Sequence, residues 1–211
     1  MTVGNVAVLH RADLRPTKVE ALRRWLPRQP WSALTDGSEV VEVGRFRFDD
    51  PAGEVGVETL LVSTTGGPVL QAPLTYRGAP LEGAQEHLVT TMDHSVLGRR
   101  WVYDAVADPV YADVLHRAVA TGGTDADLQV EVDGRLEPAA KHAGARGSGS
   151  AASAPTIREV RASTSGALTT ISTAVGDLVV IRVLGTPAPA GETLTAAWSG
   201  GPPFLLAVLA G

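Results

Sequence analysis

The stretch EVVEVGRFRFDDPAGEVGVETLLVSTTGGPVLQAPLTY, residues 39–76, decides the fold. Three runs rich in Val, Leu and Phe are separated by the turn sequences DDPAG and GGP; the runs are 39–48, 55–64 and 69–76. Apolar runs of this length with short turns between them predict strands that pair as an antiparallel meander. The alternation of apolar and polar residues shifts at Gly44, which predicts a β-bulge there.

Two helices are expected on either side of these strands. The first begins at Arg15-Pro16-Thr17, carries apolar residues at helical spacing and ends at Pro27. The second begins with Asp108 as N-cap and Pro109 as first helical residue, and it ends at Gly122-Gly123. Further strands are predicted at 88–94, 100–103 and 128–132.

The composition changes in the second half of the chain. Residues 137–155 are rich in Ala, Gly and Ser, a composition that predicts a flexible linker. Beyond it, apolar runs at 157–163, 167–175, 178–184 and 204–209 predict a second group of strands. The sequence therefore predicts a domain at 1–136, a linker at 137–155 and a small β-rich unit at 156–211.

Composition and charge argue against several classes of function. The chain has 211 residues and a net charge of -5, with no cluster of Lys and Arg that would bind a nucleic-acid backbone. It contains no cysteine, which excludes disulfides and thiolate metal sites and fits a cytoplasmic location. Its apolar runs are too short to span a membrane, so no membrane partner is expected.

Polar and aromatic residues are densest between Thr75 and Asp108. The candidate ligand-binding residues are Arg99, Arg100, Trp101, Tyr103 and Asp104. In one interpretation the two aromatic rings stack against a sugar or base while the charged groups contact its polar atoms. In the other, the rings pack within the sheet and the arginines form surface ion pairs with Asp93 and Asp104. No catalytic residue, metal ligand or cofactor-binding residue is predicted.

Three segments resemble the N-terminal cap domain of maltokinases and related aminoglycoside-phosphotransferase-like sugar kinases. They are RPTKVEALRRWLPRQPW at 15–31, PLTYRGAPLEGA at 73–84 and HSVLGRRWVYDA at 94–105, the last followed by Asp108-Pro109. Stand-alone proteins of this kind are sometimes labelled 1,4-alpha-glucan branching enzyme. The resemblance implies an α+β fold with a curved, cystatin-like antiparallel sheet and flanking helices. It also implies that the C-terminal unit is a truncated kinase N-lobe, with Arg182 at the position of the phosphate-contacting lysine.

The sequence shows no counterpart of the kinase C-lobe, with its catalytic Asp, its Asn and its metal-binding Asp. Phosphoryl transfer depends on such groups. We therefore expect a non-catalytic accessory or regulatory protein of glucan, maltose or trehalose metabolism, which binds carbohydrate or an enzyme of a glucan or trehalose pathway and needs no cofactor. Three alternatives stay open: a sugar kinase component completed by another chain, a small hydrolase using the acids between Glu82 and Asp104, and a structural homodimer.

Overall fold

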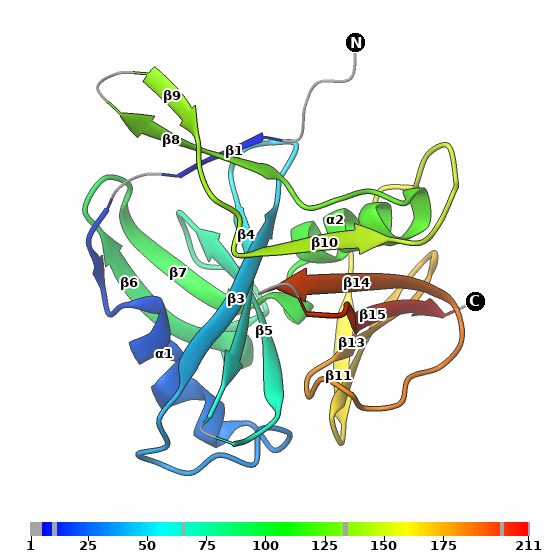
Figure 1. The fold of residues 1–211 in the computed structure, drawn as a ribbon, viewed down its shortest axis with the longest axis horizontal. Helices are drawn as coiled ribbons and strands as arrows, with labels where there is room; N and C mark the ends of the chain where they lie inside the picture. Colours follow the sequence, from blue (N-terminus) through cyan, green and yellow to red (C-terminus); the bar gives the residue numbers. More distant parts are fainter. Residues whose placement is uncertain (1–5, 10–11, 65, 133–134, 199–200, 211) are drawn as a thin grey trace.

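The computed structural model describes residues 6–9, 12–64, 66–132, 135–198 and 201–210, and within them the chain forms three β-sheets and two α-helices (Figure 1). Nearly all neighbouring strands are antiparallel, and only β1 and β8 of those described pair in parallel. The general prediction of antiparallel sheets with flanking helices is confirmed.

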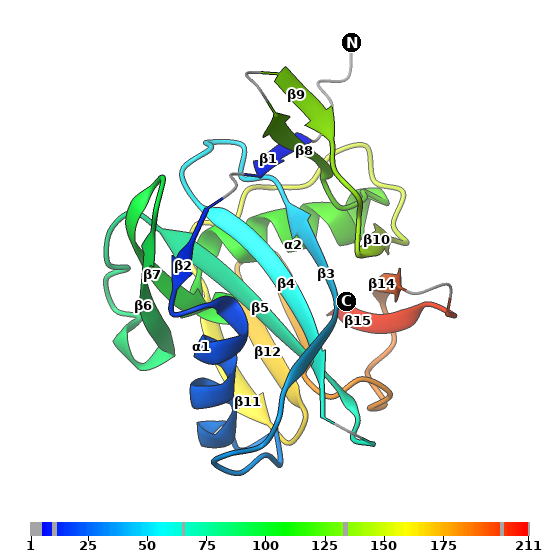
Figure 2. The same ribbon diagram turned by 60° about the vertical axis from the view of Figure 1, so that its left-hand side comes forward.

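The first large sheet contains the predicted meander and has the strand order β2-β6-β7-β5-β4-β3. A register shift between Glu42 and Gly44 confirms the predicted bulge. The sheet curls into a half-barrel around the first helix (Figure 2). Its strands are β2 (Leu14–Arg15), β3 (Val41–Phe48), β4 (Gly56–Ser63), β5 (Val69–Arg77), β6 (Leu88–His94) and β7 (Gly98–Asp104).

The two helices lie on opposite faces of this sheet (Figure 2). Helix α1 (Lys18–Trp25) begins with a capping box, in which Thr17 and Glu20 bond to each other's backbone N–H groups. Helix α2 (Pro109–Thr121) has Asp108 as N-cap and ends at Gly122 with φ +68°, as predicted. Three short 3-10 helices join neighbouring elements: η1 (Leu26–Arg28), η2 (Gln85–His87) and η3 (Ala105–Ala107).

Alternation along the strands gives the first sheet two buried faces. In β4, Val57 and Leu61 face the core that contains α2, whereas Leu60 and Val62 face the core that contains α1. The α1 side also holds Leu22, Trp25, Leu26 and Trp31. This two-sided burial explains the nearly continuous apolar run that β4 shows in the sequence.

The second large sheet has the strand order β10-β14-β15-β13-β12-β11. Its strands are β10 (Ala143–Gly147), β11 (Arg161–Ser165), β12 (Leu168–Thr173), β13 (Gly176–Ile181), β14 (Glu192–Trp198) and β15 (Phe204–Ala210). A small third sheet, in the order β1-β8-β9, consists of β1 (Val6–Leu9), β8 (Asp127–Val132) and β9 (Arg135–Pro138).

The segment predicted as a flexible linker, 137–155, differs from that prediction. Ala143–Gly147 form β10, which pairs with β14 along its whole length. The N–H groups of Gly149 and Ala151 donate to the carbonyl oxygens of Val119 and Ala120, at 2.9 Å each. These carbonyls belong to the last turn of α2, where the helix itself offers no donor. Backbone hydrogen bonds therefore fix a segment whose side chains bury little apolar area.

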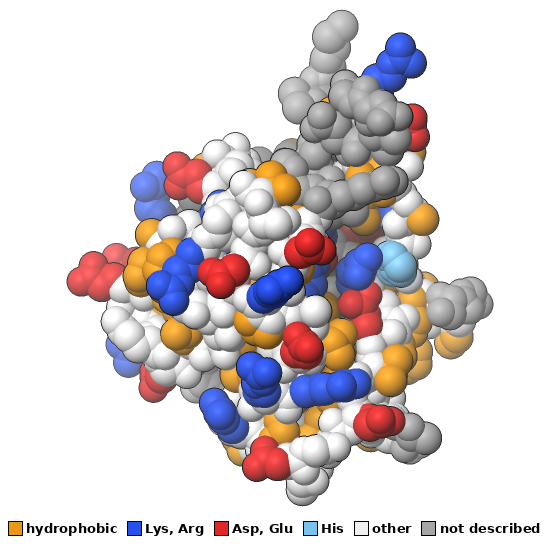
Figure 3. Space-filling model, turned by 90° about the vertical axis from the view of Figure 1, so that its left-hand side faces the viewer, with side chains coloured by type: hydrophobic (Ala, Val, Ile, Leu, Met, Phe, Trp, Pro, Cys, Tyr) orange, Lys and Arg blue, Asp and Glu red, His pale blue; other side chains and the backbone are white. Residues whose placement is uncertain are grey.

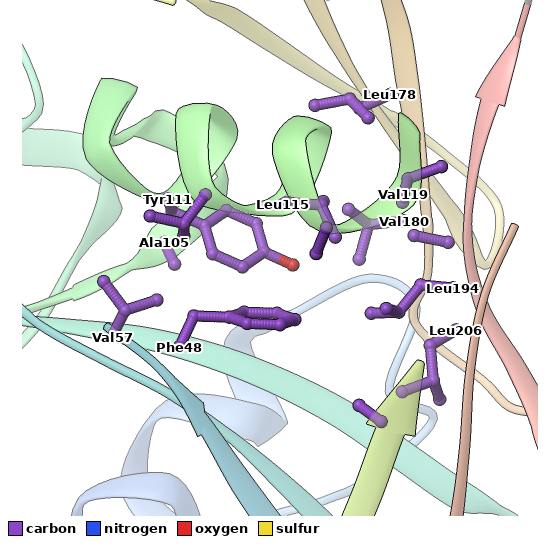
Figure 4. Close-up of a cluster of buried hydrophobic side chains, with 14 of the residues drawn as sticks. Phe48, Val57, Ala105, Tyr111, Leu115, Val119, Leu178, Val180, Leu194 and Leu206 are labelled. Atoms are coloured by element: carbon purple, nitrogen blue, oxygen red, sulfur yellow. The ribbon is translucent and has the colours of Figure 1, made fainter. Parts of the chain in front are cut away.

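One apolar core joins the two large sheets through α2. Figure 4 shows Leu115 and Val119 of α2 in one buried cluster with Phe48 of the first sheet and Val180, Leu194 and Leu206 of the second. The division into a domain at 1–136 and a unit at 156–211 stays a prediction. Neither described helix is long and apolar enough to cross a membrane.

Candidate functional site

The five candidate residues lie on β7, and the structure does not bring them together. Alternation places Arg99, Trp101 and Tyr103 on one face of the sheet and Arg100 on the other. Asp104, at the end of β7, points into the interior. A single ligand cannot contact all five side chains.

The two aromatic rings also have different environments. Tyr103 is 2% exposed, and its hydroxyl oxygen accepts a hydrogen bond from the N–H of Leu81. Trp101 is half-buried, and the guanidinium carbon of exposed Arg99 lies 5.8 Å from its ring centre, a cation–π arrangement. Of the proposed stacking pair, only Trp101 therefore has a ring within reach of a ligand.

Asp104 pairs with Arg182, which is 0% exposed. Its oxygen Oδ2 lies 2.7 Å from Nη2 of Arg182, whose Nε donates to Thr169 Oγ1 at 2.8 Å. The guanidinium also lies 5.0 Å from the ring centre of Trp31. Arg182 therefore links the end of β7 to β12 and cannot contact an external phosphate, the role that its position suggested.

A pocket of about 510 Å³ opens on the concave face of the first sheet. It lies at the end of the half-barrel that α1 does not fill. Its walls come from the chain before α1, the turn between β3 and β4, and strands β5, β6 and β7. The side chains that concern the chemistry are Lys18, Arg47, Asp49, Asp50, Glu54, Tyr76, His94 and Arg100.

A buried carboxylate binds two of the residues that line this pocket, Lys18 and Tyr76. Glu58, which is 2% exposed, accepts hydrogen bonds from Lys18 Nζ at 2.6 Å and Tyr76 Oη at 3.0 Å. Burial alone would raise the pKa of Glu58, but the charges of Lys18 and Arg47 and these hydrogen bonds outweigh it and lower the pKa. Burial and the charge of Glu58 raise the pKa of Tyr76, so its hydroxyl stays protonated and donates.

Two arginines from different strands, β3 and β7, line this pocket. Arg47 extends over Gly56, where an added β-carbon would lie 3.3 Å from its Nη2. Arg100 extends over Gly78, where an added β-carbon would lie 3.1 Å from its Nη1. Both groups thus reach toward β5 and Tyr76. The two glycines leave the space that these side chains occupy.

Sequence reasoning identified Arg100 but missed Lys18, Arg47 and Tyr76 as members of one pocket. It also missed Glu58, the buried carboxylate that pairs with Lys18. Glu58 gave a usable signal, since it is the only charged residue in the otherwise apolar run VETLLV. A charge in a strand buried on both faces needs a partner. Nothing in the sequence says that this partner is Lys18, which lies on another element.

Charge is mixed on the side of the molecule that carries α1 and β6. Figure 3 shows Lys and Arg side chains interspersed with Asp and Glu over that face. Neither sign forms a continuous patch there. This distribution favours recognition inside a pocket over recognition by a broad charged surface.

Fold and pocket together define a β-rich protein whose curled antiparallel sheet encloses one helix and leaves a polar pocket at its open end. Residues 25–108, from the end of α1 through β7 to the N-cap of α2, match the maltokinase N-terminal cap domain. The chain therefore contains a maltokinase N-terminal cap-like domain, which confirms the resemblance found in the sequence. The match covers less than half of the chain. A search of curated proteins finds no match.

Proposed function

We propose that this protein is a non-catalytic accessory or regulatory protein of maltose, glucan or trehalose metabolism. The observation that carries the proposal is the match of residues 25–108 to the maltokinase N-terminal cap domain. The family comparison finds a cap domain and no catalytic kinase domain, which is compatible with a binding role. The protein would act by binding an enzyme of such a pathway or a carbohydrate.

We place the carbohydrate contact at Trp101 and Arg99. A half-buried tryptophan offers a flat apolar surface to the face of a sugar ring. Arg99, beside that ring, supplies donors for sugar hydroxyl groups. Arg100 and Asp104 take no part in this contact, because one faces the opposite side of the sheet and the other pairs with Arg182.

A descent of residues 156–211 from a kinase N-lobe remains a proposal. What supports it is an antiparallel sheet in which β12 and β13 form a hairpin and Arg182 follows β13. In this chain Arg182 binds Asp104 and Thr169 in the interior. We therefore propose that this position has a structural role here.

Carbohydrate binding is tested by calorimetric titration with maltose and maltoheptaose. The intact protein is expected to bind the longer oligosaccharide, and Trp101→Ala should weaken binding about tenfold or more, because the stacking surface is lost. Trp198→Phe is the matched control, since Trp198 stacks on Phe204 at a different place, with ring centres 5.1 Å apart. Failure to bind any oligosaccharide, together with co-purification that recovers no enzyme of a glucan or trehalose pathway, would remove the proposal.

Thermal shift with Mg-ATP separates the proposal from the kinase alternative. A ligand that binds only the folded state raises its melting temperature. We expect no shift with Mg-ATP for this chain alone, whereas a clear rise would favour a sugar kinase component completed by another chain. Sedimentation analysis of the same sample tests the homodimer alternative.

A further inference from the structure

The open end of the half-barrel has the size and position of a small-molecule site. The other end is filled by α1 and the apolar residues packed around it. A volume of about 510 Å³ lies within the range of pockets that hold small ligands, and the mouths of β-barrels are a frequent location for them. This pocket is separate from Trp101, which faces the opposite side of the sheet.

Several charged groups of the pocket are already satisfied by the protein. Lys18 is paired with Glu58. Asp50 accepts hydrogen bonds from three backbone N–H groups, those of Ala52, Glu54 and Val55, at 2.9–3.0 Å. These groups build the walls of the pocket and keep little capacity for a ligand.

Arg47 and Arg100 are not satisfied in this way. Among the residues that the structure describes, neither guanidinium forms an ion pair with a carboxylate. The Nε atom of each is buried without a hydrogen-bond partner in the protein. Arg100 is held in place by a hydrogen bond from Nη2 to the carbonyl oxygen of Leu97 at 2.6 Å. A buried donor without an acceptor costs about 1–3 kcal/mol, which an oxygen atom of a ligand would recover.

The arginines of the pocket favour a ligand whose oxygen atoms carry a negative charge. Guanidinium groups bind phosphate and carboxylate more strongly than neutral acceptors, because the hydrogen bonds are charge-assisted. The carboxylates of Asp49 and Glu54 line the pocket at exposed positions, where they are able to accept hydrogen bonds from hydroxyl groups of a ligand. They also repel a ligand that is negatively charged along its whole length.

We propose that this pocket binds a small polyhydroxylated ligand with one phosphate or carboxylate group, and that Arg47 and Arg100 hold the anionic group. Tyr76 also lines the pocket and donates to Glu58, the partner of Lys18. The hydroxyl groups of the ligand extend toward Asp49 and Glu54. A phosphorylated sugar and a sugar acid share this chemistry, and the site is independent of the carbohydrate contact at Trp101.

Calorimetric titration with glucose 1-phosphate, glucuronate and glucose tests the proposal on the full chain. One or both anionic sugars should bind, and glucose should bind at least about tenfold more weakly, because it offers no charge to the guanidinium groups. The anionic sugar that binds more tightly identifies phosphate or carboxylate as the preferred group. Equal binding of glucose and the anionic sugars, or no binding of either anionic sugar at millimolar concentration, overturns the proposal.

Variants assign the binding to the pocket. Arg47→Gln and Arg100→Gln should each weaken binding of the anionic sugar about tenfold, while Arg161→Gln, at an exposed position of β11 in the second sheet, should leave it unchanged. Circular dichroism and the melting temperature check that each variant is folded. Should an arginine variant fail to fold, Asp49→Asn and Glu54→Gln at exposed positions of the pocket serve in its place, and each should change the affinity. Binding that survives all folded pocket variants contradicts the assignment.

One further variant separates the test of this pocket from the test of the carbohydrate contact at Trp101. Trp101→Ala should leave binding of the anionic sugar intact while it weakens binding of maltoheptaose. Loss of both by this one substitution would mean a single site and would contradict two separate ones.

Discussion

Asp104 and Arg182 form a buried ion pair that cannot be recognised from the sequence around either residue. Asp104 follows Trp101-Val102-Tyr103, and Arg182 follows an apolar strand. The two are 78 residues apart, yet their side chains meet at 2.7 Å in the interior. The pair joins β7 of the first sheet to the end of β13 in the second, so it helps to fix how the sheets lie together.

Replacing only one residue of the Asp104–Arg182 pair should strongly destabilise the protein. Asp104→Asn or Arg182→Met is expected to lower the free energy of unfolding by about 3–5 kcal/mol, because a buried charge loses its partner. The double variant Asp104→Asn with Arg182→Met should lose less than the sum of the single effects, since no charge is left unpaired. Urea unfolding of the four proteins measures these differences.

A surface pair provides the control for this measurement. Glu42 and Arg45 form an ion pair at 2.9 Å with both side chains partly exposed. Glu42→Gln should cost less than about 1 kcal/mol, since solvent screens such pairs. If Asp104→Asn cost no more than Glu42→Gln, the Asp104–Arg182 pair would have no role in holding the sheets together.

At the scale of elements, the segment 143–151 explains why composition predicted a linker where the structure has a strand. Most side chains here are small, and apolar burial is what sequence patterns detect. Gly147 and Gly149 instead let the backbone come close to the last turn of α2. The Gly147 N–H donates to Gly123 O at 2.8 Å, and the Gly149 N–H donates to Val119 O at 2.9 Å. Close backbone contacts of this kind leave no periodic signal.

Glycine is required at these two positions because a side chain would collide with α2. A β-carbon at Gly147 would overlap the carbonyl group of Ala118, and one at Gly149 would overlap that of Ala120. Gly147→Ala or Gly149→Ala should therefore lower the free energy of unfolding by about 1–3 kcal/mol or more, as overpacking does in a core. Gly144→Ala is the matched control in the same strand, since its β-carbon would meet only Asp125 Oδ1 at 4.0 Å. Equal unfolding midpoints for Gly147→Ala and Gly144→Ala would contradict this account.

The elements that sequence reasoning found are those with strong local signals. The meander, the bulge at Gly44 and both helix starts follow from alternation, turn residues and caps, all of which are local. Strand β14 was missed, although its neighbour β15 follows it closely in the chain. The pairing of β1 with β8 was missed because the two strands lie far apart in the chain. The pocket was missed for the same reason: Lys18, Arg47, Tyr76 and Arg100 come from four different elements.

At the scale of the whole molecule, the two large sheets depend on a common core. Phe46 and Phe48 of β3 belong to the same buried cluster as Leu178 and Val180 of β13, and α2 lies between them. Sheet β2-β6-β7-β5-β4-β3 buries its other face against α1. The match to the cap domain, at 25–108, ends at the N-cap of α2. The cap-like sheet is therefore completed here by a helix and a second sheet outside the matched stretch.

This shared core predicts that the chain unfolds as one unit. Urea unfolding of the full chain should give a single transition that is the same by fluorescence and by circular dichroism. Residues 1–136 alone should expose the apolar faces of α2 and β3 and bind a hydrophobic dye. The side chains that cover these faces in the full chain, among them Leu178 and Val180, are removed with the second sheet. Addition of residues 137–211 as a separate chain should restore structure only if the two parts associate. A cooperative transition and a native-like near-ultraviolet spectrum for residues 1–136 by themselves would instead establish two independent domains, and would assign the contacts through α2 to an interface that forms after folding.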